Sequence, residues 1–212
     1  MVLRGRALLS ADECARADRF YFPRDQRRYI VARAALRLHL GAELGVDATA
    51  VSFVYGEHGK PALAPPYAAS GLKFNVSHSG ELGLIGVLRG AELGVDVEAH
   101  RPLSDRDALV RRYFSEAENR VYFNLPETVR QAAFYNCWTR KEAVIKALGH
   151  GLSYSLRAFD VTLAPEDPPR LLRLQQLPGG ESGWCLTAFE PGLGYAAAVV
   201  VPGKKCVVSR IV

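Results

Sequence analysis

Apolar residues recur every three or four positions in two long stretches of the chain. This spacing predicts amphipathic helices over residues 24–40 and 126–148. Gly41 and Gly149 follow the two patterns, and glycine favours the left-handed backbone with which many helices end. We therefore expect the two long helices to end at these glycines.

Two shorter helices are indicated by capping boxes, in which a serine and a glutamate three positions later satisfy each other's backbone N–H groups. Ser10 and Glu13 form such a box for a helix over residues 10–18, and Ser115 and Glu118 form one within a helical region over 104–125.

Alternating or continuous apolar runs predict strands, with turns at the glycines and prolines between them. Residues 72–98 are typical of an antiparallel meander, with a turn at Ser77–Gly80. The remaining predicted strands are 51–55, 158–163, 171–177, 184–189 and 195–201.

The order of these elements is similar in the two parts of the chain. Each part runs from helices into strands and closes on a hairpin, which suggests an internal duplication with a join near residues 99–105. We expect an α+β fold of two similar halves, residues 1–100 and 101–212, each a small antiparallel sheet with packed helices. The active site would lie between them, where ligand clefts often form.

The composition is that of a globular protein: 49% of the 212 residues are hydrophobic and 23% are charged. The longest apolar run, near 195–201, is far shorter than the roughly 20 residues that span a bilayer. The first residues lack the apolar core of a signal peptide. The four cysteines have neither zinc-site nor redox-motif spacing. These features predict a soluble cytoplasmic protein with no membrane association.

Positive charge is concentrated at the start of the chain. Residues 1–40 hold nine arginines against four acidic residues, an excess of +5 that equals the net charge of the whole chain. Guanidinium groups bind phosphates and carboxylates bidentately, although a solvated helix face would have the same composition. No helix-turn-helix or aromatic-basic pattern favours nucleic acid as the partner.

The segment 94–98 reads Gly-Val-Asp-Val-Glu. On a strand, Asp96 and Glu98 would share one face and the two valines the other. Adjacent carboxylates repel each other, and a hard divalent cation such as Mg²⁺ relieves that repulsion. The segment alone is equally consistent with two carboxylates that are simply solvated at a strand edge.

The segment 138–146 contains a second set of charged residues that could act at a site. On a helix, Trp138, Glu142 and Lys146 fall four positions apart near one face. Glu142 could add a third carboxylate to a cation, and Lys146 could meet a phosphate. A surface ion pair is the plainer interpretation of this segment alone.

Two further segments could bind an anion. Residues 74–80 combine two hydroxyls, an imidazole and a glycine that could direct hydrogen-bond donors at an anion, or form an ordinary polar turn. Gly59-Lys60-Pro61 lacks the upstream glycine and the helix of a P-loop, which argues against nucleotide hydrolysis by that fold.

Taken in order, the segments 59–61, 74–79, 94–98 and 138–146 resemble the motifs of 4′-phosphopantetheinyl transferases of the surfactin-synthetase-activating type. The resemblance covers residues 20–150. The trimeric holo-acyl-carrier-protein synthases are about half this length, so the resemblance favours the monomeric class with a pseudo-twofold fold.

The resemblance implies transfer of the phosphopantetheine arm of coenzyme A to a serine of an acyl or peptidyl carrier protein of fatty-acid, polyketide or nonribosomal-peptide biosynthesis. It implies a Mg²⁺ ion, with Mn²⁺ as the alternative, held by Asp96, Glu98 and Glu142. Glu142 would accept the serine proton, directly or through a metal-bound water, and Lys146 would contact the phosphate bridge. The residues implied to bind coenzyme A are Arg28, Arg33, Lys60, Pro61, Ser77, His78 and Lys146.

Two other functions fit the same residues. The basic N-terminal region would suit a non-catalytic module that binds anions or carrier proteins. The three carboxylates would also suit a Mg²⁺-dependent pyrophosphate hydrolase.

Overall fold

The computed structural model describes residues 2–56, 59–149, 154–174, 180–203, 206 and 208. Its contacts group the chain into two compact units, Met1–Lys73 and Phe74–Val212, which are described separately below. The predicted division at residue 100 stays a prediction. In the described part of the chain, no helix combines the length and apolar character needed to cross a membrane.

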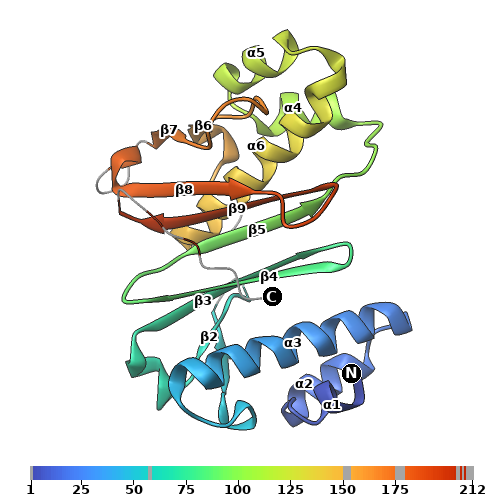
Figure 1. Ribbon diagram of the computed structural model, residues 1–212, viewed down its shortest axis with the longest axis vertical. Coiled ribbons are helices and arrows are strands. Elements are labelled where there is room, and N and C mark those ends of the chain that lie inside the picture. The colour runs from blue at the N-terminus through green and yellow to red at the C-terminus, as the bar shows by residue number, and fades with distance from the viewer. Residues whose placement is uncertain are drawn as a thin grey trace. The chain divides into compact units, whose positions relative to one another are not determined.

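The first unit is mainly helical, and its long helix α3 is the central element (Figure 1). The predicted short helix forms with its capping box, since Glu13 accepts a hydrogen bond from the Ser10 N–H at 3.0 Å. The elements are α1 (Val2–Arg6), α2 (Ala11–Asp18), α3 (Pro23–Leu44), the 3-10 turns Ala48–Ala50 and Tyr67–Ser70, and the paired strands β1 (Phe53–Tyr55) and β2 (Pro61–Leu63).

Helix α3 continues past Gly41, so the predicted end of this helix was wrong. Its last residue is Leu44, and Gly45 closes it with a φ of 70°. Gly41 instead serves packing, because a Cβ there would lie 2.9 Å from the Val46 carbonyl oxygen. Both glycines fit the sequence pattern, and the chain that returns beside Gly41 determines which one ends the helix.

In the described part of the second unit, the strands form three small groups, and the long helix α6 packs against the group of β5, β9 and β8 (Figure 1). Strand β3 begins at the boundary between the units and pairs with β4, β5 and β8 both pair with β9, and β6 pairs with β7. The elements are β3 (Leu72–Ser79), β4 (Leu82–Arg89), β5 (Gly94–Ala99), α4 (Arg106–Tyr113), α5 (Glu116–Asn124), α6 (Glu127–Leu148), β6 (Phe159–Val161), β7 (Leu171–Leu174), β8 (Trp184–Phe189) and β9 (Tyr195–Pro202).

The predicted meander over 72–98 was wrong in two respects. Residues 77–79 belong to strand β3, and the turn comes at Gly80–Glu81. Strand β5 pairs with β9, about 100 positions away in the sequence, rather than with β4. The alternation of side chains shows that a segment is a strand, but it does not identify the neighbour.

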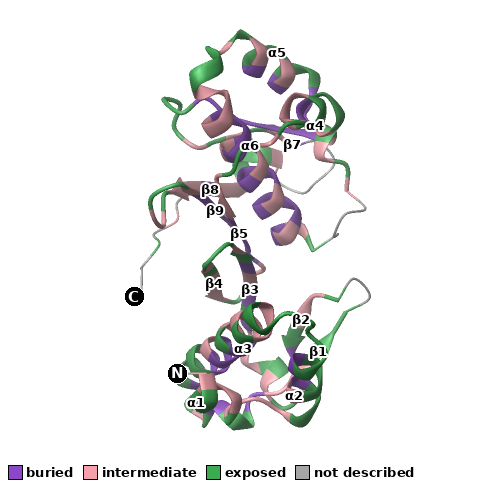
Figure 2. Cartoon of the chain, turned by 90° about the vertical axis from the view of Figure 1, so that its right-hand side faces the viewer, coloured by how far each residue is buried: buried purple, intermediate pink, exposed green. Residues whose placement is uncertain are grey.

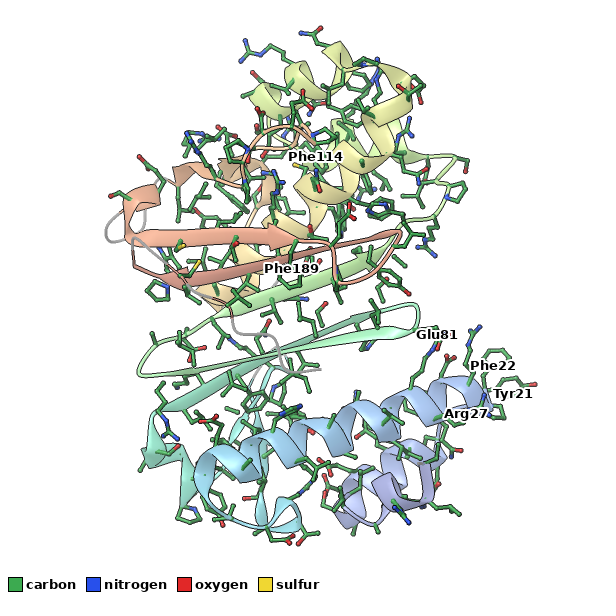
Figure 3. The ribbon with its side chains drawn as sticks, in the orientation of Figure 1. Tyr21, Phe22, Arg27, Glu81, Phe114 and Phe189 are labelled. Carbon is green, nitrogen blue, oxygen red and sulfur yellow. The ribbon has the colours of Figure 1, made fainter. Side chains whose placement is uncertain are left out.

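The predicted helical region 104–125 forms the two helices α4 and α5. Ser115 caps the second of them, with the Glu118 N–H at 3.2 Å from its Oγ, as the capping box predicts. Phe114 lies at the break between the two helices (Figure 3). Its side chain is fully buried and is stacked on Phe134, with ring centroids 5.7 Å apart. The buried ring anchors the connection between α4 and α5.

Helix α6 packs on β5 and β9 and ends at Gly149 in the left-handed conformation, as predicted. Buried residues of α6 and β5 meet in the interior of this unit (Figure 2). Gly94 allows the close approach, because a Cβ there would lie 1.9 Å from the Ala143 carbonyl oxygen and 2.4 Å from the Ala147 nitrogen. The glycine at the start of β5 therefore sets the distance between the strand and the helix.

Candidate active site

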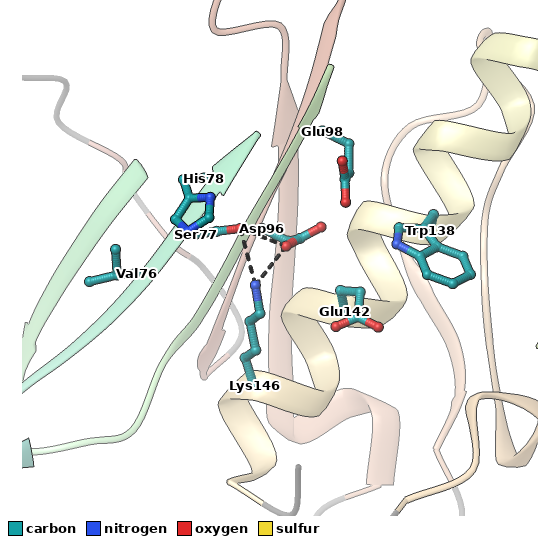
Figure 4. Close-up of a pocket in the computed structure, with 8 residues that line it drawn as sticks. All are labelled: Val76, Ser77, His78, Asp96, Glu98, Trp138, Glu142 and Lys146. Carbon is teal, nitrogen blue, oxygen red and sulfur yellow. Dashed lines mark hydrogen bonds and ion pairs between the residues drawn. The ribbon is translucent and has the colours of Figure 1, made fainter. Parts of the chain in front are cut away.

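A pocket of about 390 Å³ opens between β3, β5 and α6, entirely within the second unit (Figure 4). It brings together all the residues predicted from the segments 94–98 and 138–146, and two from 74–79. Its lining is Val76, Ser77, His78, Asp96, Glu98, Trp138, Glu142 and Lys146.

Strand β5 directs its two carboxylates to the pocket because strand side chains alternate. Val95 and Val97 are each 1% exposed and face the interior, whereas Asp96 and Glu98 line the pocket. The predicted division of this segment into an apolar and an acidic face is confirmed.

Helix α6 supplies the opposite wall. Trp138, Glu142 and Lys146 lie one turn apart and all line the pocket, which confirms the predicted shared face. The Trp138 ring is held by aromatic contacts with Tyr113 and Phe134, at 5.8 and 5.7 Å between centroids. Phe134 lies on α6 itself, so the contact with Tyr113 of α4 is the one that ties the rotation of the helix, and with it the direction of Glu142, to a neighbouring element.

Lys146 crosses the pocket from the helix to the strand. Its Nζ donates to Asp96 Oδ1 at 2.6 Å and to Ser77 Oγ at 3.1 Å. The Ser77 hydroxyl donates to the same Asp96 oxygen at 2.8 Å (Figure 4). One oxygen of Asp96 is thus bound by an ammonium and a hydroxyl, and these contacts hold the lysine across the pocket.

The pocket raises the pKa of all three carboxyl groups. Burial is the largest cause for Asp96, Glu98 and Glu142. Repulsion by Asp96 further raises the pKa of the two glutamates, while Lys146 opposes the shift in each group. Three acids in one partly desolvated space favour either protonation or a positive partner.

The donor set fits a hard divalent cation. Asp96 Oδ2 is buried without a hydrogen-bond partner, and the carboxylates of Glu98 and Glu142 turn towards the same space (Figure 4). Carboxylate oxygens are the protein ligands that Mg²⁺ prefers. Among the described residues, no three acidic, histidine or cysteine side chains are gathered closely enough to form a preformed metal site. Glu98 and Glu142 would therefore have to move inward to share an ion with Asp96.

Ser77 and His78 line the pocket but have different surroundings. Ser77 is buried, and its hydroxyl is occupied by Asp96, Lys146 and the Val97 N–H. His78 is exposed. Of these two, the histidine is the side chain open to a ligand from solvent.

The remaining predicted ligand residues, Arg28, Arg33, Lys60 and Pro61, belong to the first unit. Arg33 is only 9% exposed there, and its guanidinium is 3.3 Å from Glu13 and donates to the Tyr55 hydroxyl at 2.9 Å. In the structure, Arg33 therefore forms contacts within the first unit, with Glu13 and Tyr55.

The other three residues are more accessible than Arg33. Arg28 is partly exposed and lies 3.5 Å from Asp25, Lys60 lies in the connection between β1 and β2, and Pro61 begins β2. A phosphate contact by any of these four residues stays a prediction.

Two residues beside the pocket belong to the segment 74–80 but were assigned no individual role from the sequence. Asn75 and Ser79 of β3 flank Ser77 at alternate positions and direct their side chains to β5, as described below. The period of two in the segment 73–79 could have identified them, had the turn not been placed at Ser77.

Comparisons with known proteins support the sequence resemblance. The family described as 4′-phosphopantetheinyl transferase superfamily matches residues 92–200, and the family described as 4′-phosphopantetheinyl transferase, N-terminal, matches residues 3–87. The chain is 41% identical over 197 residues to 4′-phosphopantetheinyl transferase HetI of Nostoc sp., covering 93% of this chain and 80% of that protein.

Two further comparisons give lower identities. 4′-Phosphopantetheinyl transferase Sfp of Bacillus subtilis is 28% identical over 196 residues, which covers 92% of this chain and 83% of Sfp. The solved structure of a holo-(acyl-carrier-protein) synthase from Bacillus anthracis, in complex with CoA (3′,5′-ADP), is 20% identical. It matches with a TM-score of 0.44 over 54% of this chain and 97% of that one.

Proposed function

This chain belongs to the 4′-phosphopantetheinyl transferase superfamily, and from that premise we propose that it modifies a carrier protein at the pocket between β5 and α6. The enzyme class predicted from the sequence is confirmed by the family and by the relatives. The observation that carries the assignment of the site is the meeting of Asp96, Glu142 and Lys146 in one pocket.

In the proposed reaction, the carrier serine attacks the phosphorus that bears the pantetheine arm of coenzyme A. The serine oxygen–phosphorus bond forms, the pyrophosphate bond breaks, and adenosine 3′,5′-bisphosphate leaves. Such a reaction depends on alignment and charge neutralisation more than on a covalent enzyme intermediate.

Glu142 is the proposed general base. It lies in the pocket opposite the strand carboxylates, and burial raises its pKa towards the range in which a carboxylate accepts a proton readily. It would take the proton of the serine hydroxyl, directly or through one water.

Lys146 is the proposed counter-charge for the departing phosphate. Its ammonium is already held in the pocket by Asp96 and Ser77. A lysine fixed before the substrate binds needs little reorganisation as negative charge develops on the bridging oxygen.

Asp96, Glu98 and Glu142 would hold Mg²⁺, with Mn²⁺ as the alternative ion. The orphaned Asp96 oxygen and the mutual repulsion of the carboxylates support this role. When bound, the ion would supply positive charge to the pyrophosphate of coenzyme A.

As the resemblance implies, Lys60, Pro61, Ser77 and His78 would bind the adenosine 3′-phosphate end of coenzyme A, and Arg28 and Arg33 would make further phosphate contacts. The arginine-rich start of the chain would favour encounter with an acidic carrier protein. We further propose that the enzyme acts as a monomer in the cytoplasm.

Incubation of the purified chain with Mg²⁺, coenzyme A and an apo carrier protein, followed by mass spectrometry, tests the function. A carrier heavier by one phosphopantetheine arm supports the transferase. Cleaved coenzyme A with an unmodified carrier would instead indicate a hydrolase, and no change in either would indicate a binding module.

The location of the site is tested by Asp96→Ala, which we expect to abolish transfer without loss of the fold. Glu116→Ala is the matched control, since this exposed carboxylate lies on α5 outside the pocket. Full activity of Asp96→Ala would reject the site.

A further inference from the structure

Strand β3 meets β5 through side chains rather than through a backbone ladder. The two strands belong to different sheets, and β5 pairs on its other side with β9. Three backbone N–H groups of β5 point to β3, and each donates a hydrogen bond to a side-chain oxygen of β3. Val95 donates to Asn75 Oδ1 at 2.9 Å, Val97 to Ser77 Oγ at 3.3 Å and Ala99 to Ser79 Oγ at 3.0 Å.

The two serines make a second contact with their own hydroxyl protons. Ser77 donates to Asp96 Oδ1 and Ser79 donates to Glu98 Oε2, each at 2.8 Å. Each hydroxyl therefore accepts from one β5 residue and donates to the carboxylate of the residue just before it.

A comparison with Asn75, the third of these β3 side chains, indicates that the serine hydroxyls serve to bind the carboxylates of β5. Asn75 accepts from the Val95 N–H just as the two serines accept from Val97 and Ala99. The residue before Val95 is Gly94, however, which has no carboxylate to bind. Along β3, a serine stands at both positions that face an acid, and an amide stands where there is none. Backbone pairing alone would not require this difference, because both kinds of side chain can accept an N–H.

We infer that Ser79 is a positioning residue that holds the Glu98 carboxylate in its orientation beside the pocket, as Ser77 does for Asp96; this inference rests on the proposed function of these carboxylates. Ser79 lies outside the pocket lining, so it acts through Glu98 rather than on the substrate.

The position of β3 does not depend on Ser79 alone. The turn after this strand is held by Tyr195, whose hydroxyl accepts a hydrogen bond from the Glu81 N–H at 3.1 Å. Ser77 and Asn75 keep their own contacts with β5. Removal of the Ser79 hydroxyl is therefore expected to release Glu98 while the strand stays in place.

The test compares Ser79→Ala, Ser79→Thr and Asn75→Ala with the parent chain. Alanine at either position leaves one β5 N–H without its acceptor, but only Ser79→Ala also frees a carboxylate. Asn75→Ala is thus the matched control for loss of stability, and Ser79→Thr restores a hydroxyl.

Affinity for Mn²⁺, measured by electron paramagnetic resonance in the absence of substrate, is the main readout. Loss of a hydrogen bond to a metal-binding side chain typically weakens metal binding roughly 10-fold or more. We expect a loss of that size in Ser79→Ala, recovery in Ser79→Thr and little change in Asn75→Ala. In turnover assays, Ser79→Ala should lower kcat more than it raises KM for coenzyme A.

The outcomes separate the two claims. If Asp96→Ala abolishes Mn²⁺ binding but Ser79→Ala binds as tightly as the parent, the role of Ser79 is wrong and the metal site stands. Equal losses in Ser79→Ala and Asn75→Ala would also overturn the inference, because the effect would then be structural. If the parent chain binds no Mn²⁺, the proposed metal site fails and the role of Ser79 fails with it.

Discussion

Substitution of Gly94 by alanine tests whether the spacing of β5 and α6 builds the active site. The new Cβ would lie 1.9 Å from the Ala143 carbonyl oxygen and 2.4 Å from the Ala147 nitrogen. Both atoms are helix backbone, so no side chain can rotate away. The strand and the helix would have to separate by about 1 Å or more, since non-bonded carbon and oxygen atoms do not approach much closer than ~3 Å.

This separation should affect both stability and rate. Overpacking of a core costs about 1–3 kcal/mol, and rigid backbone on both sides places Gly94→Ala near 3 kcal/mol. For a chain of this size, that corresponds to a fall in Tm of roughly 6–12 °C. A displacement of ~1 Å between the carboxylates of β5 and Glu142 should slow transfer by about 10²-fold.

The measurements are thermal unfolding by circular dichroism and carrier modification followed by mass spectrometry below the lowered Tm. Gly83→Ala is the matched control, because it adds the same methyl group to β4, where the nearest atom would be 4.0 Å away. A Gly94→Ala enzyme with the parent's Tm and rate would refute the view that this glycine sets the geometry of the site.

Three further substitutions probe other parts of the molecule. Glu142→Gln should lower kcat by ~10²–10⁴-fold if the side chain is the base, with a smaller effect on coenzyme A affinity by calorimetry; normal turnover would remove it from the mechanism. Burial opposes ionisation of Asp160, but hydrogen bonds from Arg173 and Ser115 outweigh burial and lower the pKa of this carboxyl group. The ionised Asp160 therefore stabilises the fold above the ordinary carboxyl pKa, and this stabilisation is lost as pH falls through the lowered pKa. Asp160→Asn should therefore flatten the acid side of a plot of Tm against pH, and an unchanged slope there would contradict this. Arg37 is 2% exposed, pairs with Glu13 at 2.7 Å and donates to the Ala48 and Val51 carbonyls. Arg37→Met would leave Arg33 as the remaining guanidinium partner of Glu13 and both carbonyls without this donor, so it should cost about 3 kcal/mol in urea unfolding, whereas a loss below ~1 kcal/mol would show that the pair is dispensable.

Local features of the fold were largely predictable. The capping boxes at Ser10 and Ser115 and the left-handed end of α6 at Gly149 depend on residues close in sequence, and all three are observed. The end of α3 was misplaced because Gly41 is adapted to a chain segment that packs beside it, which a local pattern does not reveal.

The site was predictable where periodicity alone decides the direction of a side chain. Asp96 and Glu98 share a face of β5 because strands have a period of two, and Glu142 and Lys146 share a face of α6 because they are one turn apart. The internal pairing of Arg33 with Glu13 was not predictable, since the same arginine on a solvated helix face would have the same sequence context.

The sequence by itself therefore determined which side chains each strand and helix presents together, because those directions follow from backbone geometry over a few residues. The tertiary structure alone decided that β5 pairs with β9, that Gly94 lies against α6, and that the serines of β3 reach the carboxylates of β5. These contacts join residues from 19 to about 100 positions apart, and they depend on which surfaces become neighbours when the chain buries its apolar residues.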